Sequence, residues 1–156
     1  MTDTPDPLST LDELAADARA ERQTALHALH VLEYALDAPT PRRHRTWLHR
    51  LTVAVDALHV ALRAQLPQAD GPIRLLDELA LTHPSCIPRI EHLQQELLDL
   101  TITVASLREL LEPDPAIDID PAEIRDRLGK VNQRFREHQA SEATLVHEVT
   151  GLRIVG

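Results

Sequence analysis

Residues 121–151 read PAEIRDRLGKVNQRFREHQASEATLVHEVTG, and their periodicity decides the fold. Apolar side chains recur at alternating steps of four and three residues, which is the period of an α-helix with one buried face. Asp120, Pro121 and Glu123 form a strong helix start, and Gly151 is a natural stop. The segment therefore predicts one long helix over 121–150. Its buried face consists of Ile124, Leu128, Val131, Phe135, His138, Glu142, Leu145 and Val149.

Three further segments have the same period and are bounded by prolines. They predict long helices near 10–38, 42–66 and 86–112, with a short connecting helix over 73–81. Thr10 and Glu13 match a capping box at the start of the first helix, and Thr40 with Pro41 would start the second. The connections within the first pair and the second pair of long helices are short, so each pair is expected to be antiparallel.

The predicted fold is therefore all-α, an antiparallel up-down-up-down four-helix bundle. We expect a single domain over residues 1–156, which is an ordinary length for one domain. Residues 1–8 are expected to form a flexible N-terminus and residues 151–156 a C-terminal tail.

The composition is that of a helical protein with an acidic surface. Of the 156 residues, 43% are hydrophobic but only 2% are aromatic, so leucine, alanine and valine must fill the core. Twenty-five acidic and 16 basic residues give a net charge of −9, which argues against nucleic acid as a partner. Cys86 is the single cysteine, so no internal disulfide forms. The acidic start lacks the pattern of a signal peptide, and no apolar run has the ~18 residues of a membrane span, so we expect a cytoplasmic protein without a membrane partner.

His138 and Glu142 occupy consecutive positions on a helix face that should otherwise be dry. Counting from the ends of antiparallel helices brings Arg22, His59 and residues 93–97 to the same level. We therefore predict a buried polar layer formed by Arg22, His59, His138 and Glu142. Burying a carboxylate without a partner costs several kcal/mol, so Glu142 requires a cation or another polar partner.

Three interpretations of this layer are open from the sequence. In the first, the planar guanidinium of Arg22 pairs with an ionised Glu142, and His138 is hydrogen-bonded alongside. In the second, His59, His138 and Glu142 are ligands of a metal ion. In the third, the polar side chains line a small-ligand pocket within the bundle.

Three stretches of the chain match the pattern of a known family. They are DALHVALRAQ (56–65), PRIEHLQQELLDL (88–100) and FREHQASEATLVHEV (135–149). From about residue 20 to residue 150 the chain resembles the hemerythrin-like, cation-binding four-helix bundles. That family carries a histidine on the first helix, His-x-x-x-Glu on the second, Glu-His on the third, and a histidine with an acidic partner on the fourth. The resemblance implies this fold and places His59, His138 and Glu142 in ligand positions, with iron as the cofactor of an intact site.

Two of the family's ligand positions hold other residues. The second-helix glutamate position is Arg63, and the third-helix Glu-His pair is Glu96-Leu97. Leucine has no donor atom, and an arginine repels a nearby cation, so we predict a degenerate site without a resident cofactor. The alternative is a retained iron site for oxygen or redox sensing.

No enzyme motif accompanies this pattern. Four glycines leave no phosphate-binding loop, and neither the Glu-x-x-His of ferritin-like sites nor a nucleophile elbow occurs. We therefore predict a non-catalytic structural or protein-interaction module, with an unidentified protein partner or self-association through a second apolar face of the second helix, Val53, Ala57 and Val60. The basic segment PRRHRTWLHR (41–50) is a candidate anion patch, with Arg42, Arg43, Arg45 and Arg50.

Overall fold

The computed structural model of the chain describes residues 7–38, 44–112 and 120–155. Within these ranges the chain is all-α and contains no strand, which confirms the predicted class. The elements are α1 (Pro7–Asp37), α2 (His44–Gln65), α3 (Leu75–Thr82), the 3-10 turn η1 (Pro84–Cys86), α4 (Ile87–Leu111) and α5 (Pro121–Thr150). The predicted spans of the four long helices agree with the observed ones, with ends displaced by at most three residues.

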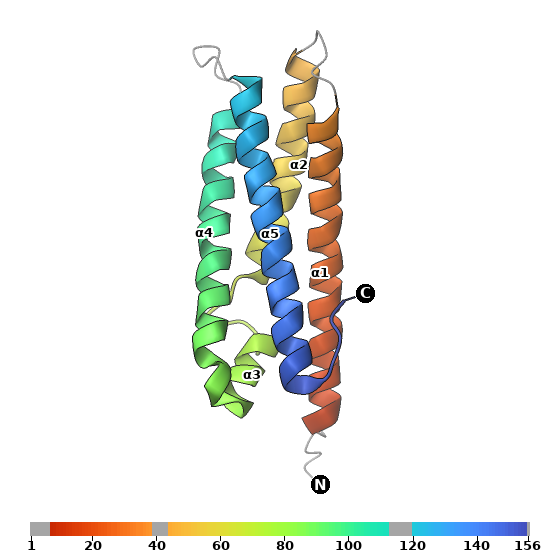
Figure 1. Cartoon of the computed structure of the whole chain (residues 1–156), viewed down its shortest axis with the longest axis vertical. Coiled ribbons are helices and arrows are strands. Elements are labelled where there is room, and N and C mark those ends of the chain that lie inside the picture. Colours follow the sequence, from red (N-terminus) through yellow and green to blue (C-terminus); the bar gives the residue numbers. More distant parts are fainter. Residues whose placement is uncertain (1–6, 39–43, 113–119, 156) are drawn as a thin grey trace.

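The four long helices lie side by side along the longest axis of the molecule (Figure 1). α1 packs against α2 and α5, α2 packs against α4, and α4 packs against α5. α3 is much shorter and lies at the end of the molecule from which α1 starts (Figure 1). The chain between Leu66 and Arg74 has no helix, so the predicted break between the second and third long helices is confirmed.

The predicted ends of α5 are confirmed. The side chain of Asp120 accepts a hydrogen bond from the backbone N–H of Ala122 at 3.0 Å, which satisfies one of the free donors at the helix start. Gly151 ends the helix with φ of 71°, a left-handed conformation that glycine adopts without steric cost.

α1 begins earlier than the sequence predicted. It starts at Pro7, so the predicted capping box of Thr10 and Glu13 lies inside the helix and not at its start. Proline is well tolerated at a first helical position, because the N–H at that position has no helical partner. Residues 7 and 8, expected in a flexible terminus, therefore belong to α1. Residues 1–6 and the predicted start of α2 at Thr40 and Pro41 lie outside the described residues.

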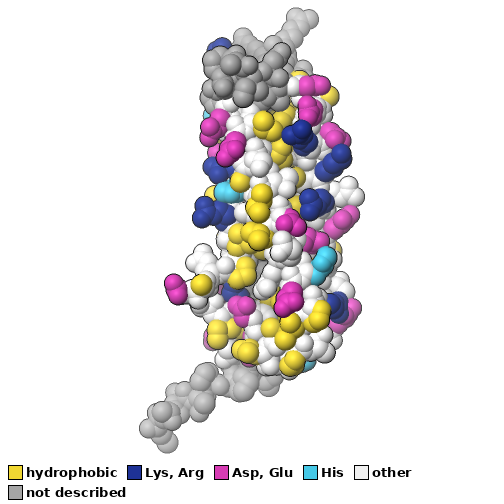
Figure 2. All heavy atoms as spheres, turned by 90° about the vertical axis from the view of Figure 1, so that its left-hand side faces the viewer, with side chains coloured by type: hydrophobic (Ala, Val, Ile, Leu, Met, Phe, Trp, Pro, Cys, Tyr) yellow, Lys and Arg dark blue, Asp and Glu magenta, His cyan; other side chains and the backbone are white. Residues whose placement is uncertain are grey.

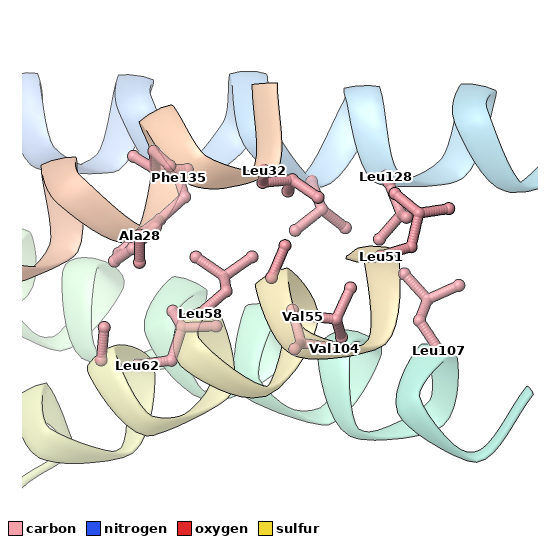
Figure 3. Close-up of a cluster of buried hydrophobic side chains, with 14 of the residues drawn as sticks. Ala28, Leu32, Leu51, Val55, Leu58, Leu62, Val104, Leu107, Leu128 and Phe135 are labelled. Atoms are coloured by element: carbon pink, nitrogen blue, oxygen red, sulfur yellow. The ribbon is translucent and has the colours of Figure 1, made fainter. Parts of the chain in front are cut away.

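Buried apolar side chains form two clusters. The larger one lies where the four long helices meet, and Figure 3 shows its side chains pointing toward one another from α1, α2, α4 and α5. Trp47 and Phe135 are its largest fully buried members, and the indole N–H of Trp47 donates to the backbone oxygen of Ala35 at 3.1 Å. Burial of each large side chain contributes roughly 1.5–3 kcal/mol, so this cluster supplies most of the apolar stabilisation.

The second cluster lies toward the α3 end of the molecule. It consists of Ala15, Leu75, Leu79, Cys86, Ile90, Leu93, Ala143, Leu145, Val146 and Ile154. Ile154 is 2% exposed and Leu152 packs beside it, so residues 152–154 fold back onto this cluster. Figure 1 shows that segment running back beside α1.

Polar side chains separate the two clusters. On α5 they are His138, Gln139 and Glu142, which lie between Phe135 of the larger cluster and Ala143 of the smaller one. At the same level α1 contributes Arg22, α2 ends with Gln65, and α4 contributes Glu96. We call Arg22, Gln65, Glu96, His138, Gln139 and Glu142 the polar layer.

The surface on the α4 side carries hydrophobic side chains along its length, with charged side chains on both sides (Figure 2). The large exposed apolar residues of α4 are Ile87, Leu98 and Ile102. In the described part of the chain, no helix combines the length and the apolar character that crossing a membrane requires.

Candidate functional site

His138 is the centre of the polar layer. Its side chain is 2% exposed, and its Nδ1 lies 2.8 Å from Oε1 of Glu96 on α4. The ring stacks on Phe135, with 6.2 Å between the ring centroids. Because a carboxylate can only accept a hydrogen bond, Nδ1 carries the ring proton. In the neutral ring, Nε2 is then an acceptor, and it faces Oε2 of Glu142 at 3.9 Å.

Burial shifts both titratable groups of this pair toward their neutral forms. Burial lowers the pKa of His138, and the hydrogen bond and charge of Glu96 counteract part of that shift. Burial also raises the pKa of Glu142 to about 7, and the neighbouring charge of Glu21 adds to this effect. Arg74 and Arg22 act in the opposite direction on Glu142 but do not restore its ordinary value of 4.5. At neutral pH Glu142 is therefore partly ionised and partly protonated.

Arg22 lies in the polar layer as predicted, but it does not pair with Glu142. Its Nη1 donates to the backbone oxygen of Gln139 at 2.7 Å, and no ion pair joins it to Glu142 in the described structure. The Nε of Arg22 is buried without a hydrogen-bond partner. The predicted pair does not form because the guanidinium of Arg22 binds the backbone oxygen of Gln139. Glu142 lies about one helical turn further along α5.

His59 lies outside the polar layer, contrary to the prediction. α2 meets the layer at Gln65, whose Oε1 accepts a hydrogen bond from Nε2 of Gln139 at 2.9 Å. The separation of six residues from position 59 to position 65 corresponds to about 9 Å along a helix. Counting from the helix ends misplaced His59 because Gln65 lies 21 positions after the start of α2, whereas its partner Gln139 lies only 18 positions after the start of α5.

His59 belongs instead to a cluster between α2 and α4. Its Nδ1 accepts a hydrogen bond from Nη1 of Arg108 at 3.0 Å, and Nε of Arg108 contacts Oδ1 of Asp56 at 2.7 Å. Burial lowers the pKa of His59, and the positive charges of Arg108 and Arg63 lower it further. The predicted ligand set of His59, His138 and Glu142 is therefore not assembled. Among the described residues, no group of three or more His, Cys, Asp or Glu side chains is placed to hold a metal ion.

A cavity opens beside the polar layer, with a volume of about 270 Å³. It lies between α1, α4, α5 and the connector that follows α2, and both His138 and Glu142 line it. α2 ends at Gln65 and α3 begins at Leu75, so the connector covers a position that a longer α2 would have filled. Leu97 also lines the cavity beside His138 and Glu142, and its side chain has no atom that could bind a metal ion.

Sequence reasoning missed four charged residues that line this cavity, Asp17, Glu21, Arg74 and Asp77. Arg74 forms an ion pair with Glu21 and donates to the backbone oxygens of Ala64 at 2.7 Å and Leu66 at 3.2 Å. These carbonyls lie at the end of α2, where helical hydrogen-bond partners run out. Burial raises the pKa of Glu21, against the effect of Arg74. The sequence did contain a signal for Arg74, because an arginine a few residues after the end of a helix can bind the free carbonyl groups of that helix.

The two predicted surface features stay predictions. Of the candidate anion patch, Arg45 and Arg50 are exposed, whereas Arg42 and Arg43 lie outside the described residues. Val53 and Val60 are 53% and 66% exposed, and Ala57 is exposed between them.

Comparison of the chain with protein-family models, with curated proteins and with solved structures finds no match. The hemerythrin-like resemblance therefore stays a prediction from the residues that carry it.

Proposed function

We propose that the chain is an antiparallel four-helix bundle of the hemerythrin-like type with a degenerate metal site, and that it acts as a non-catalytic interaction module. The pairing of residues supports the arrangement. Between α1 and α5, the amide of Asn132 donates to the backbone oxygen of Leu29, whereas Arg22 reaches Gln139. Residue numbers thus rise along α1 as they fall along α5, as expected of antiparallel neighbours.

The residues around His138 are the main support for a degenerate metal site. Leu97, in the position where the family places a histidine, lines the cavity beside His138 and Glu142 and offers no lone pair. Arg63, in the position of a ligand glutamate, is exposed and carries a positive charge. His59 is engaged by Arg108. Two ligands on one helix fall short of the three or more protein ligands that bound metal ions ordinarily have.

The experiment is a metal titration of protein stripped with a chelator. A metal ion that binds only the folded state raises the free energy of unfolding by about 2.7 kcal/mol at a hundredfold excess over its Kd. We expect Fe²⁺, added without oxygen, to leave the melting temperature of wild type and His138→Ala unchanged. A saturable rise in the wild type that His138→Ala abolishes contradicts the degenerate site.

The second candidate is a retained cation site, and one contact favours it. The carboxylate of Glu96 holds Nδ1 of His138, which leaves Nε2 free and directed at Glu142. In metal sites, a carboxylate behind a ligand histidine fixes the ring in this manner. The same titration separates the two candidates.

The interaction surface we propose is the outer face of α2, formed by Val53, Ala57 and Val60. These apolar side chains are exposed and lie one helical turn apart, as in the seam of two paired helices. Sedimentation equilibrium over a concentration series tests self-association through this face. We expect dimers in the wild type and monomers for Val60→Glu, with Ile102→Glu on α4 as the matched control. Monomers throughout, or an equal effect of the control, contradict this surface.

A further inference from the structure

When Glu142 is ionised, two hydrogen-bond acceptors face the cavity without a donor between them. They are Nε2 of His138 and the carboxyl group of Glu142, whose closest approach is 3.9 Å. That distance exceeds the 2.7–3.2 Å of a hydrogen bond, so neither group satisfies the other. No hydrogen bond to the carboxyl group of Glu142 is present in the described structure, although its side chain is only 18% exposed. A group with two or more N–H donors, placed between these acceptors, would satisfy both.

The charges around the cavity favour a positive ligand. Asp17, Glu21 and Asp77 line it together with Glu142, and Arg74 is the only arginine or lysine among its lining residues. The guanidinium of Arg74 pairs with Glu21 and donates to a backbone oxygen at the end of α2. The carboxylate of Asp77 accepts a hydrogen bond from the backbone N–H of Arg74 at 3.1 Å. The cavity is therefore net negative, and its positive charge is already paired.

The remaining walls are mostly apolar. They include Leu14, Ala18, Ile73, Leu76, Leu93 and Leu97. The volume of about 270 Å³ corresponds to roughly nine water molecules at about 30 Å³ each. Apolar walls with a few convergent polar groups are typical of sites for small organic molecules.

We propose that this cavity binds a small organic cation, with a primary ammonium or amidinium head between His138 Nε2 and the Glu142 carboxylate and a short apolar body against the leucine-rich walls. The site goes beyond the interaction module proposed above, and it needs no metal ion. A hydrated metal ion would leave the apolar walls without a contact, whereas an amphipathic amine uses both parts of the cavity. The neutral Nε2 of His138 accepts from the head group, and the carboxylate of Glu142 compensates its charge.

The proposal has a pH dependence that follows from the groups facing Glu142. Glu21, Arg22 and Arg74 act on Glu142 by charge, and His138 faces it across the cavity. Asp17 on α1 and Asp77 on α3 line the same cavity, and Glu96 on α4 contacts His138. Because the pKa of Glu142 lies at about 7, a bound cation must displace its proton below that pH. The affinity for an amine should therefore rise about tenfold between pH 6 and pH 8, since the ionised fraction of Glu142 rises by that factor.

The test is calorimetric titration of chelator-stripped protein with three six-carbon probes: n-hexylamine, 1-hexanol and n-hexanoate. We expect saturable binding of n-hexylamine, weaker binding of 1-hexanol by at least about tenfold, and no binding of n-hexanoate. Glu142→Gln should weaken n-hexylamine binding about tenfold or more. Glu148→Gln should leave the affinity unchanged, because Glu148 lies on the same helix but pairs with Arg89 away from the cavity.

A second variant keeps the test independent of any effect of Glu142 on folding. Ala18→Leu adds three carbons to the cavity wall and leaves every charge in place, so it should also weaken n-hexylamine binding about tenfold or more. The proposal is overturned if n-hexylamine shows no saturable binding, if 1-hexanol binds equally well, or if neither variant weakens binding. None of these outcomes depends on the metal titration, so this proposal and the proposed function can fail separately.

Discussion

Oε1 of Glu96 lies 2.8 Å from Nδ1 of His138, and this contact joins α4 to α5 at the level where the apolar core is interrupted. It fixes the ring so that Nε2 faces Glu142 and the cavity. The polar layer is therefore an oriented arrangement in which one carboxylate supports the imidazole and a second carboxyl group stands without a donor.

Glu96→Gln should lower the pKa of His138 further. The hydrogen bond and charge of Glu96 raise that pKa against the effect of burial, so removing the charge leaves burial less opposed. NMR titration of the imidazole signals measures the change, with the exposed His147 as an internal control. An unchanged or higher pKa of His138 in the variant would mean that Glu96 does not hold the ring in solution.

Glu142→Gln should stabilise the protein at alkaline pH more than at acidic pH. The folded-state pKa of about 7 lies above the ordinary value of 4.5, so the folded protein binds this proton more tightly than the unfolded chain. The associated stability is fully present below about pH 4.5 and is lost as pH rises to about 7. A shift of this size corresponds to about 3 kcal/mol at most.

Urea unfolding of the wild type and Glu142→Gln at pH 5 and pH 8 checks this dependence, because comparison at each pH cancels the other titrating groups. The variant should gain up to about 3 kcal/mol relative to the wild type between the two pH values. Glu91→Gln, an exposed change on α4, should show no such difference. Equal effects of Glu142→Gln at both pH values would mean that Glu142 titrates normally.

Arg22→Met should cost less than about 1.5 kcal/mol. It removes one hydrogen bond to the backbone oxygen of Gln139, but it also removes a buried Nε that has no partner. A double-mutant cycle with Glu142→Gln at pH 8 should give a coupling energy below about 1 kcal/mol, because the two side chains are not in contact. A coupling of about 3 kcal/mol or more is typical of a broken buried ion pair and would restore the direct pair that the sequence suggested.

The two glycines of the α5 region should respond to alanine in opposite ways. Gly129 lies within the helix, and a Cβ added there meets nothing within 4 Å, so Gly129→Ala should stabilise by about 0.5–1 kcal/mol. Gly151 has φ of 71°, so Gly151→Ala should destabilise by about 1–2 kcal/mol. Chemical denaturation of the pair gives both values. A neutral or stabilising effect of Gly151→Ala would show that the left-handed end of α5 is not maintained in solution, and a destabilising effect of Gly129→Ala would contradict the open space beside Gly129.

The periodicity of the sequence predicted the helices and the level of the polar layer, but not the partners within it. Steps of three and four residues specify which face of a helix is buried, and counting residues from the helix ends put Arg22 and His138 at one level. Neither observation specifies which of several polar groups at one level a side chain reaches. Arg22 therefore binds a backbone carbonyl group, and His138 binds Glu96. The sequence had indicated Glu96 only as part of a family pattern.

A pocket lined by the polar side chains was one of the three interpretations of the sequence, but its walls could not be predicted because they depend on a segment without periodicity. α2 ends at Gln65, and the connector to α3 brings Arg74 to Glu21 and covers the space left at the end of α2. No hydrophobic pattern defines the path of residues 66–74. His59 was misplaced for a different reason, since counting from the helix ends does not show how far the start of α2 is displaced along the molecule from the start of α5.

The metal content of the purified protein tests the degenerate site most directly. The protein should be produced in cells supplied with iron and analysed for iron, zinc and manganese by mass spectrometry, beside His138→Ala. We predict well under one metal ion per chain in both proteins, because His138 and Glu142 have no third protein ligand and Leu97 stands beside them. About one or more iron ions per chain in the wild type, lost in His138→Ala, would contradict the account.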